Sequence, residues 1–380
     1  MEPLTVVLTL RDRVSYTARW MEYANYIAFP FQVIVADGSS DGSAEELLSK
    51  HDRFPDVHYT YVRYPYDETY THYYSKLVDV LDRVRTPFVT LADNDDFFIV
   101  ECMLECVRFL QQHPDYLACG GLGGTLWLSP SSFALKQAPL YAKEVTWKCT
   151  NGLPSIEEPT ARERLQPRHL GGSDICYYDV KRTDELRKQF RIVRDLNLHD
   201  LFLVEWLVFF LTCVAGKTKR LPRLYLARQQ DSPGGSGATH TQQFGDWLGR
   251  MLVDSWSEDF GKFASCISAA IADTDGISEA DARAHVIRLY RMGIAPSLLS
   301  NLLDEPNIGT LAPAVFAIVR RIVRMPETSR LRRLARRVYR NINAICVETD
   351  MAQIFRTRVP GANNDIKAVL TFLSQPPPQY

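Results

Sequence analysis

The stretch Pro87-Phe88-Val89-Thr90-Leu91-Ala92-Asp93-Asn94-Asp95-Asp96 decides the fold, because an apolar run ends directly in three carboxylates. A short continuous apolar run is typical of a strand that is buried on both faces. In open α/β sheets, ligands bind outside the carboxyl ends of such strands. Side chains alternate along an extended chain, so Asp93 and Asp95 point the same way. We therefore expect these two carboxylates to share a hard divalent ion, Mn²⁺ or Mg²⁺. The alternative is a solvated Asp-rich turn.

Two earlier segments repeat this pattern of an apolar run followed by a polar turn. Leu4–Leu10 ends in Arg11-Asp12-Arg13, and Phe31–Ala36 ends in the DGSSDGS turn Asp37–Ser43. A helical stretch from about Tyr16 to Ala28 lies between them, which gives the order strand, helix, strand. This alternation predicts an α/β fold with a mostly parallel central sheet, flanking helices and polar strand ends along one edge.

In order and spacing these motifs resemble family 2 of the GT-A nucleotide-sugar glycosyltransferases. Those enzymes open with a strand of the type TVVIPTYNR, continue to a DGSSDGS loop and then carry a DxD motif. The counterparts here are Thr5–Arg13, Asp37–Ser43 and Asp93–Phe97, and the resemblance covers about Leu4 to Arg228. It implies a GT-A (Rossmann-like) fold and inverting, metal-dependent transfer from a nucleoside diphosphate sugar, UDP-linked in the first instance.

The resemblance also implies roles for single residues. Asp37 would accept hydrogen bonds from the nucleobase, while the backbone of Thr9, Leu10 and Arg11 would line the base and ribose pocket. Asp95 would be the principal ligand of a Mn²⁺ or Mg²⁺ ion that bridges the diphosphate. Asp93 would lie nearer the ribose and the ion. The other candidates for binding the nucleotide sugar are Arg13, Ser39, Lys76, Asn94 and Arg228, and His240 is a further candidate metal ligand.

An inverting transferase needs a general base that removes the proton from the acceptor hydroxyl. Relatives place a carboxylate at the start of a helix, before a glycine. Glu205 lies eleven residues before Gly216, inside the apolar run Leu201–Phe210, whereas Asp200 lies at the expected helix start. Burial would raise the pKa of such an acid, which suits a base. Asp200 can equally be a plain N-cap, so both residues stay candidates.

Local patterns predict further elements. Ser43 is expected to cap the helix after the DGSSDGS turn, with Glu46 completing a capping box. Asn151–Ser173, rich in proline, glycine and charge, is expected to form a mobile loop. The next expected elements are a strand at Asp174–Tyr178, a helix from Lys181, an edge strand at Leu224–Ala227 and a Gly-rich segment up to His240.

The net charge of −1 gives the chain no general attraction to nucleic acid. Charge is nevertheless concentrated in Arg320–Arg340, where nine arginines interleave with apolar residues at helical spacing. This region is either a solvated helix face or a surface that docks on an anionic membrane or an acidic acceptor glycan.

The longest apolar run, Leu201–Ala215, is too short to span a bilayer. We find no signal peptide, and the eight cysteines form no CxxC pair, which predicts reduced thiols and a cytoplasmic protein, in part peripheral at the inner membrane face.

Two domains are expected: a catalytic GT-A domain at residues 1–240 and a helical C-terminal domain at residues 241–380. Helical periodicity in the second part covers Phe244–Ala272, Ser278–Leu303, Leu311–Arg324, Ser329–Cys346 and Asn364–Leu373. The oligomeric state is not predicted.

The predicted activity is sugar transfer to a glycan, a lipid-linked saccharide or a protein, as in the synthesis of surface polysaccharides or glycoconjugates. One alternative is a sugar-phosphate nucleotidylyltransferase, which would need a Gly-rich, basic phosphate loop after the first strand, and this chain lacks one. The other is a glycan- or membrane-binding module with a non-catalytic GT-A site.

Overall fold

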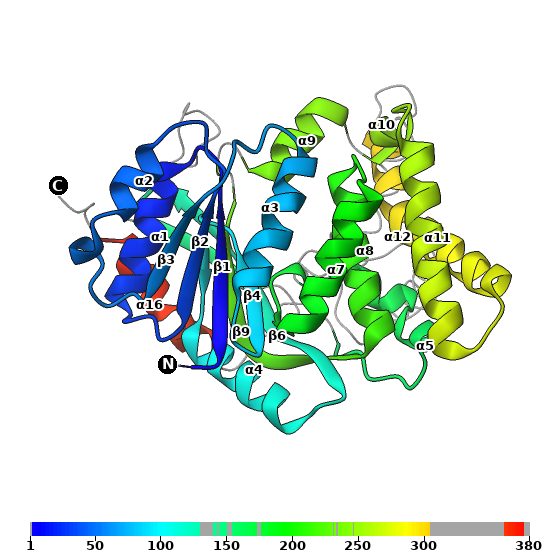
Figure 1. Cartoon of the computed structure of the whole chain (residues 1–380), viewed down its shortest axis with the longest axis horizontal. Helices are drawn as coiled ribbons and strands as arrows, with labels where there is room; N and C mark the ends of the chain where they lie inside the picture. The colour runs from blue at the N-terminus through cyan, green and yellow to red at the C-terminus, as the bar shows by residue number, and fades with distance from the viewer. Residues whose placement is uncertain are drawn as a thin grey trace, which may run out of the picture.

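The computed structural model describes residues 2–129, 140–142, 144–149, 154–172, 176–230, 232, 235–245, 247–304 and 361–375. A single nine-stranded sheet lies at its centre, with helices on both faces (Figure 1). The strand order is β3-β2-β1-β4-β8-β6-β9-β5, and β7 pairs with β6 outside this path. The strands are β1 (Leu4–Leu10), β2 (Gln32–Asp37), β3 (Tyr59–Arg63), β4 (Phe88–Ala92), β5 (Asp96–Phe98), β6 (Tyr116–Ser129), β7 (Glu144–Cys149), β8 (Val180–Arg182) and β9 (Lys217–Gln229).

Six strands share one direction. β1 to β4 are mutually parallel, β8 is antiparallel to both β4 and β6, and β9 is parallel to β6. Only β5, β7 and β8 run the other way among the described strands. The predicted α/β fold with a mostly parallel central sheet, flanking helices and C-terminal helices is therefore confirmed.

Alternation along β1 explains why the sheet has two cores. Val6 and Leu8 pack on one face with α1, α2, α4 and α16, while Val7 packs on the other face with α3, α7, α8, α11 and α12. Strands buried on both faces are apolar throughout, which is why β1 and β4 were readable as continuous runs. The helices are α1 (Val14–Tyr26), α2 (Ser43–Leu48), η1 (His51–Arg53), α3 (Tyr70–Arg83), α4 (Val100–Gln112), α5 (Ala161–Arg164), η3 (Pro167–Gly172), α7 (Thr183–Leu196), α8 (Leu201–Ala215), α9 (Ser236–Phe244), α10 (Trp247–Met251), α11 (Trp256–Asp275), α12 (Glu279–Asp304), α15 (Ala362–Asp365) and α16 (Lys367–Leu373).

The C-terminal helices contact both cores. α11 packs on α8 and α12 packs on α11, so they extend the second core. α16 returns to the far side of the molecule and lies beside α1 (Figure 1). The predicted helices Leu311–Arg324 and Ser329–Cys346, and the basic region Arg320–Arg340, lie outside the described residues.

Several local predictions are wrong. Gly42, not Ser43, is the N-cap of α2, because the carboxylate of Asp41 accepts the Ser43 amide (2.9 Å) and closes a local turn first. β9 is an interior strand rather than an edge strand, since the three-residue β5 covers its outer side.

The region after β7 also differs from its prediction. Cys176 and Tyr177 are helical, so the predicted strand at Asp174–Tyr178 starts only at Val180, and the helix starts at Thr183. The expected mobility of Asn151–Ser173 stays a prediction, but the described part of this segment is anchored to α8. The buried Arg164 donates hydrogen bonds to the carbonyls of Cys213 (2.6 Å) and Val214 (2.8 Å).

Within the described part of the chain, no helix has the length and hydrophobicity to cross a bilayer. The seven cysteines in that part are all free thiols, as the sequence predicts.

Candidate functional site

Three carboxylates gather where β4 ends and β5 begins. Asp93, Asp95 and Asp96 each offer one oxygen, and these oxygens lie within 4.8 Å of one another. The chain turns tightly between the two strands, which brings Asp96 to the same place as the predicted pair. We call these three residues the acidic cluster.

Each member of the acidic cluster has a protein partner. Arg13 donates to Asp95 (3.0 Å) and Arg228 to Asp96 (3.0 Å), while the hydroxyl of Tyr178 donates to Asp93 (2.6 Å). Ser232 also donates to Asp95. Two guanidinium groups are therefore in direct contact with the acidic cluster.

Burial governs the acidity of the acidic cluster. Burial raises the pKa of Asp96 to about 8 against the opposing charge of Arg228, and it raises the pKa of Asp93 together with the charge of Asp95. Burial acts in the same sense on Asp95, but the Arg13 guanidinium and the Ser232 hydroxyl outweigh it and hold the pKa of Asp95 below its usual value. Burial thus makes Asp93 and Asp96 harder to ionise, and an added cation would favour their ionised forms.

A cavity of about 550 Å³ opens at this edge of the sheet. Its wall begins with Thr9, Leu10 and Arg11 at the end of β1, a predicted nucleotide-binding segment. Residues from the start of α3 and the start of α8 also line it. The other cavity-lining residues include Arg13, Asp67, Tyr70, Tyr73, Tyr74, Asp93, Asn94, Asp95, Asp96, Tyr177, Tyr178, Phe202, Glu205, Arg228 and Ser232.

Two of the predicted nucleotide-binding residues stabilise the backbone around the cavity, Lys76 from behind it and Asn94 from its lining. Lys76 is buried, pairs with Asp67 and donates to the carbonyl of Leu10 (3.0 Å), so it holds the end of β1 in place. The Asn94 side chain donates to the carbonyl of Arg13 (3.3 Å) and to the hydroxyl of Thr17 (3.1 Å). Asn94 therefore fixes the start of α1 against the acidic cluster.

Asp37 and Ser39 are not among the cavity-lining residues, although Asp37 is the sheet partner of Leu10, which lines the cavity. Asp37 is buried and accepts from the Ser39 amide (2.8 Å), the Tyr61 hydroxyl (2.6 Å) and Arg63 (2.6 Å). The Ser39 hydroxyl accepts from the amide of Asp12 (2.9 Å). Both side chains stabilise the turns after β1 and β2, and the predicted contact of Asp37 with a nucleobase stays a prediction.

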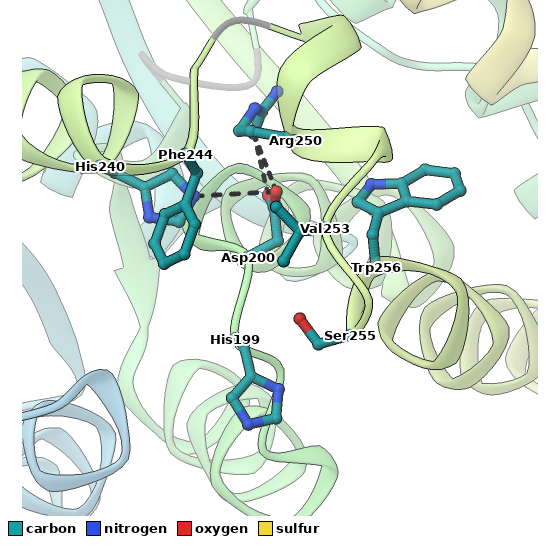
Figure 2. Close-up of a pocket in the computed structure, with 8 residues that line it drawn as sticks. All are labelled: His199, Asp200, His240, Phe244, Arg250, Val253, Ser255 and Trp256. Atoms are coloured by element: carbon teal, nitrogen blue, oxygen red, sulfur yellow. Dashed lines mark hydrogen bonds and ion pairs between the residues drawn. The ribbon is translucent and has the colours of Figure 1, made fainter.

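The two candidate bases occupy different environments. Glu205 lines the large cavity, one turn into α8. Asp200 is the N-cap of α8 and accepts from the Leu203 amide (2.9 Å), as its alternative interpretation predicts. Asp200 lines a separate space with His240 and Arg250 (Figure 2). The structure therefore offers Glu205, and not Asp200, to a ligand in the large cavity.

His240 does not join the acidic cluster. Its Nε2 lies 3.7 Å from Oδ2 of Asp200, and its ring packs against Tyr70 and Phe202. This placement gives no support to the prediction that His240 shares a metal with Asp95.

Sequence reasoning missed three polar residues of the site. Tyr178 reaches Asp93, Ser232 reaches Asp95, and Asp67 holds Lys76 beneath the cavity. Tyr178 follows Cys176-Tyr177 in a segment predicted as a strand, where alternation alone could not give its direction. Asp67 lies in the loop after β3. Its role could have been predicted only from the need of the buried Lys76, on the next helix, for an acidic partner.

No protein-family model matches this sequence, and no curated protein matches it. Among solved structures, the chain is similar to S. aureus TarS. The structure of TarS 1–349 in complex with UDP-GlcNAc gives a TM-score of 0.45 at 15% identity, covering 77% of this chain and 72% of that chain. TarS 1–349 in complex with UDP gives 0.42 at 15% identity with the same coverage, 77% and 72%. These values are too low to carry an activity or a residue role from TarS to this chain.

Proposed function

We propose that this chain transfers a sugar from a nucleoside diphosphate sugar, UDP-linked in the first instance, to a hydroxyl of an acceptor glycan, lipid-linked saccharide or protein. One observation carries the proposal: a single cavity of about 550 Å³ joins the acidic cluster to the carboxylate of Glu205. This volume is within the range of small-molecule sites. The same cavity therefore contains the acidic cluster, which can bind a cation, and the Glu205 carboxylate, which can accept a proton.

The reaction would proceed by direct displacement with inversion. The acceptor oxygen forms a bond to the anomeric carbon while the bond from that carbon to the diphosphate oxygen breaks. Glu205 accepts the proton of the acceptor hydroxyl, and the electron pair of the broken bond leaves with the diphosphate. Arg13 and Arg228 line the cavity and can donate to phosphate oxygens in bidentate fashion.

Asp93, Asp95 and Asp96 would hold Mn²⁺ or Mg²⁺, which supplies Lewis-acid stabilisation of the negative charge on the departing diphosphate. The donor set fits, since three carboxylates are hard oxygen ligands. The raised pKa values of Asp93 and Asp96 show that ionisation is unfavourable there, and a bound dication would favour the ionised form.

Calorimetric titration with UDP tests the proposal. We expect micromolar binding in the presence of Mn²⁺ and a large loss of affinity after its removal with a chelator. Asp95→Ala should reduce the Mn²⁺-dependent affinity by at least about tenfold, because one charged ligand is lost. Asp184→Ala removes an exposed carboxylate from α7 and serves as the matched control, with unchanged affinity expected.

The same titrations separate the alternatives. No binding of any nucleotide, with or without Mn²⁺, would contradict the transferase and favour a glycan- or membrane-binding module. Unchanged affinity in Asp95→Ala would contradict the metal site. A panel of nucleotide sugars, assayed for release of nucleoside diphosphate, then identifies the donor.

A further inference from the structure

We propose that Asp200 is a positioning residue for Glu205. Together with Arg250 and His240 it fixes the start of α8 to α9 and α10, and thereby holds the Glu205 carboxylate in the cavity. This inference rests on the proposed function. It assigns to α9 and α10 the task of positioning the base. It also assigns the role of the base to Glu205 rather than to Asp200.

Asp200 is held by groups from two other helices (Figure 2). Nη1 of Arg250, on α10, lies 2.9 Å and 3.2 Å from the two carboxylate oxygens, and Nε2 of His240, on α9, lies 3.7 Å from Oδ2. The exposed fractions are 7% for Asp200, 3% for Arg250 and 2% for His240. The buried charges of Asp200 and Arg250 interact strongly, because little water screens them.

A second acidic residue holds the same backbone from the other side. Asp259, on α11, is buried and accepts from the amides of His199 (2.8 Å) and Asp200 (3.1 Å). Asp200 in turn accepts from the amide of Leu203. The first turn of α8 is therefore fixed by α9, α10 and α11 at once.

The first turn of α8 contributes to the lining of the cavity. The Arg250 guanidinium stacks over the ring of Phe202 (4.1 Å), and Phe202 lines the cavity one turn before Glu205. His240 packs edge-on against Phe202 (5.6 Å) and Tyr70 (5.7 Å), which also lines the cavity. A helix transmits a shift at its start to the next turn, since its backbone is a continuous hydrogen-bonded ladder. Misplacing a reacting group by about 1 Å can cost on the order of 100-fold in rate.

Asp200 is poorly suited to be the base itself. The space that it lines with His240 and Arg250 measures about 20 Å³, room for about one water molecule and none for a saccharide. Burial raises the pKa of Asp200, but His240, Arg250 and the Leu203 amide outweigh it and hold the pKa below the usual value. Such a carboxylate is a weak proton acceptor.

A double-mutant cycle between positions 250 and 205 tests this assignment. The readout is the rate of nucleoside diphosphate release from the donor that the panel identifies. Arg250→Met removes the ion pair while keeping most of the side-chain length, and it should lower kcat by roughly 10- to 100-fold. UDP affinity should stay within about twofold of wild type, because none of the described cavity-lining residues belongs to α10. Arg250→Lys restores a cation and should recover part of the rate.

The cycle distinguishes positioning from a merely structural role. If Arg250 acts through Glu205, Arg250→Met should slow the Glu205→Gln variant little further, because the group being positioned is already lost. Losses that multiply in the double variant, or an unchanged kcat in Arg250→Met, would overturn the inference. Arg288→Met, at an exposed arginine on α12, is the matched control and should leave kcat unchanged.

Two further outcomes are informative. If Arg250→Met does not fold, as judged by circular dichroism, the cycle is run with Arg250→Lys and His240→Gln, and the same non-additivity is required. A wild-type chain that binds no nucleotide would contradict the proposed function and this inference with it. Intact UDP binding with additive losses contradicts this inference alone.

Discussion

At the scale of single residues, arginines decide the charge of the cavity. Arg13 and Arg228 contact Asp95 and Asp96 through charge-assisted hydrogen bonds, and Arg228 also stacks over the ring of Tyr178 (5.0 Å). A metal ion that binds the carboxylates would leave both guanidinium groups available to a diphosphate. Arg13 and Arg228 can therefore neutralise either the carboxylates of the acidic cluster or the phosphates of a bound diphosphate.

Arg19 shows how far this network extends behind the cavity. It is fully buried and donates to the side chain of Gln229 (2.7 Å), next to Arg228 in β9. Burial lowers the pKa of Arg19 to about 10, and the charge of Asp95 opposes this effect. The acidic cluster thus stabilises a buried cation on α1, which ties that helix to β9.

Asp37 gives a prediction about stability and pH. Burial raises its pKa, but hydrogen bonds from Ser39, Tyr61 and Arg63 outweigh burial and hold the pKa below the usual value. A carboxylate with a lowered folded pKa stabilises the fold above its unfolded pKa of about 3.9, and this stabilisation is lost as the pH falls through the folded pKa. Asp37→Asn should therefore cost about 1–3 kcal/mol at pH 7, and the difference from wild type should shrink below about pH 4.

Urea unfolding at pH 7, 5 and 3.5 measures this difference. Asp184→Asn, at an exposed ion pair on α7, should change the free energy of unfolding by less than about 0.5 kcal/mol at pH 7. A deficit in Asp37→Asn that stays constant down to pH 3.5 would contradict the ionised state assigned to Asp37.

At the scale of elements, the sequence predicts those helices and strands whose stabilising interactions lie close together in the chain. β1, α1 and β4 follow from apolar runs and turn signals within about ten residues, so their positions were predicted within two residues. The acidic cluster was predictable for the same reason. The helix start at Asp200 was also predicted. The partners of Asp200 were not, because they are 40 or more residues away, on helices whose approach no local pattern encodes.

The contact between α8 and α12 gives a prediction at this scale. A Cβ atom added at Gly293 of α12 would lie 2.1 Å from Cη2 of Trp206, the neighbour of Glu205 on α8. Gly293→Ala should therefore push the helices apart and lower the free energy of unfolding by about 1–3 kcal/mol, measured in urea. The matched control is Gly261→Ala on α11, where an added Cβ meets nothing within 4 Å. Alanine there should stabilise by up to about 1 kcal/mol through helix propensity. Equal effects of the two substitutions would contradict this packing.

At the scale of the whole molecule, the C-terminal residues close the first core. Ile366, Val369, Phe372 and Leu373 of the last turns are buried against α1 and its neighbours, and Asp365 pairs with Arg223 of β9 (2.8 Å). Helices from the end of the chain therefore complete the hydrophobic layer that supports β1, the strand whose end lines the cavity. The predicted boundary at residue 240 stays a prediction, but residues on both sides of it share the two cores.

Phe372 tests this dependence of the sheet on the end of the chain. Its ring is 5% exposed and contacts the rings of Tyr23 (5.4 Å), Tyr26 (5.7 Å) and Tyr141 (5.6 Å). Phe372→Ala leaves a cavity under α1 and should lower the free energy of unfolding by about 3–5 kcal/mol. The loss should appear equally in circular dichroism and in tryptophan fluorescence if the two cores unfold together. Lys367→Ala, at an exposed position of α16, controls for the helix itself and should have little effect. A small loss in Phe372→Ala, or transitions that separate between the two probes, would show that the C-terminal helices are dispensable for the sheet.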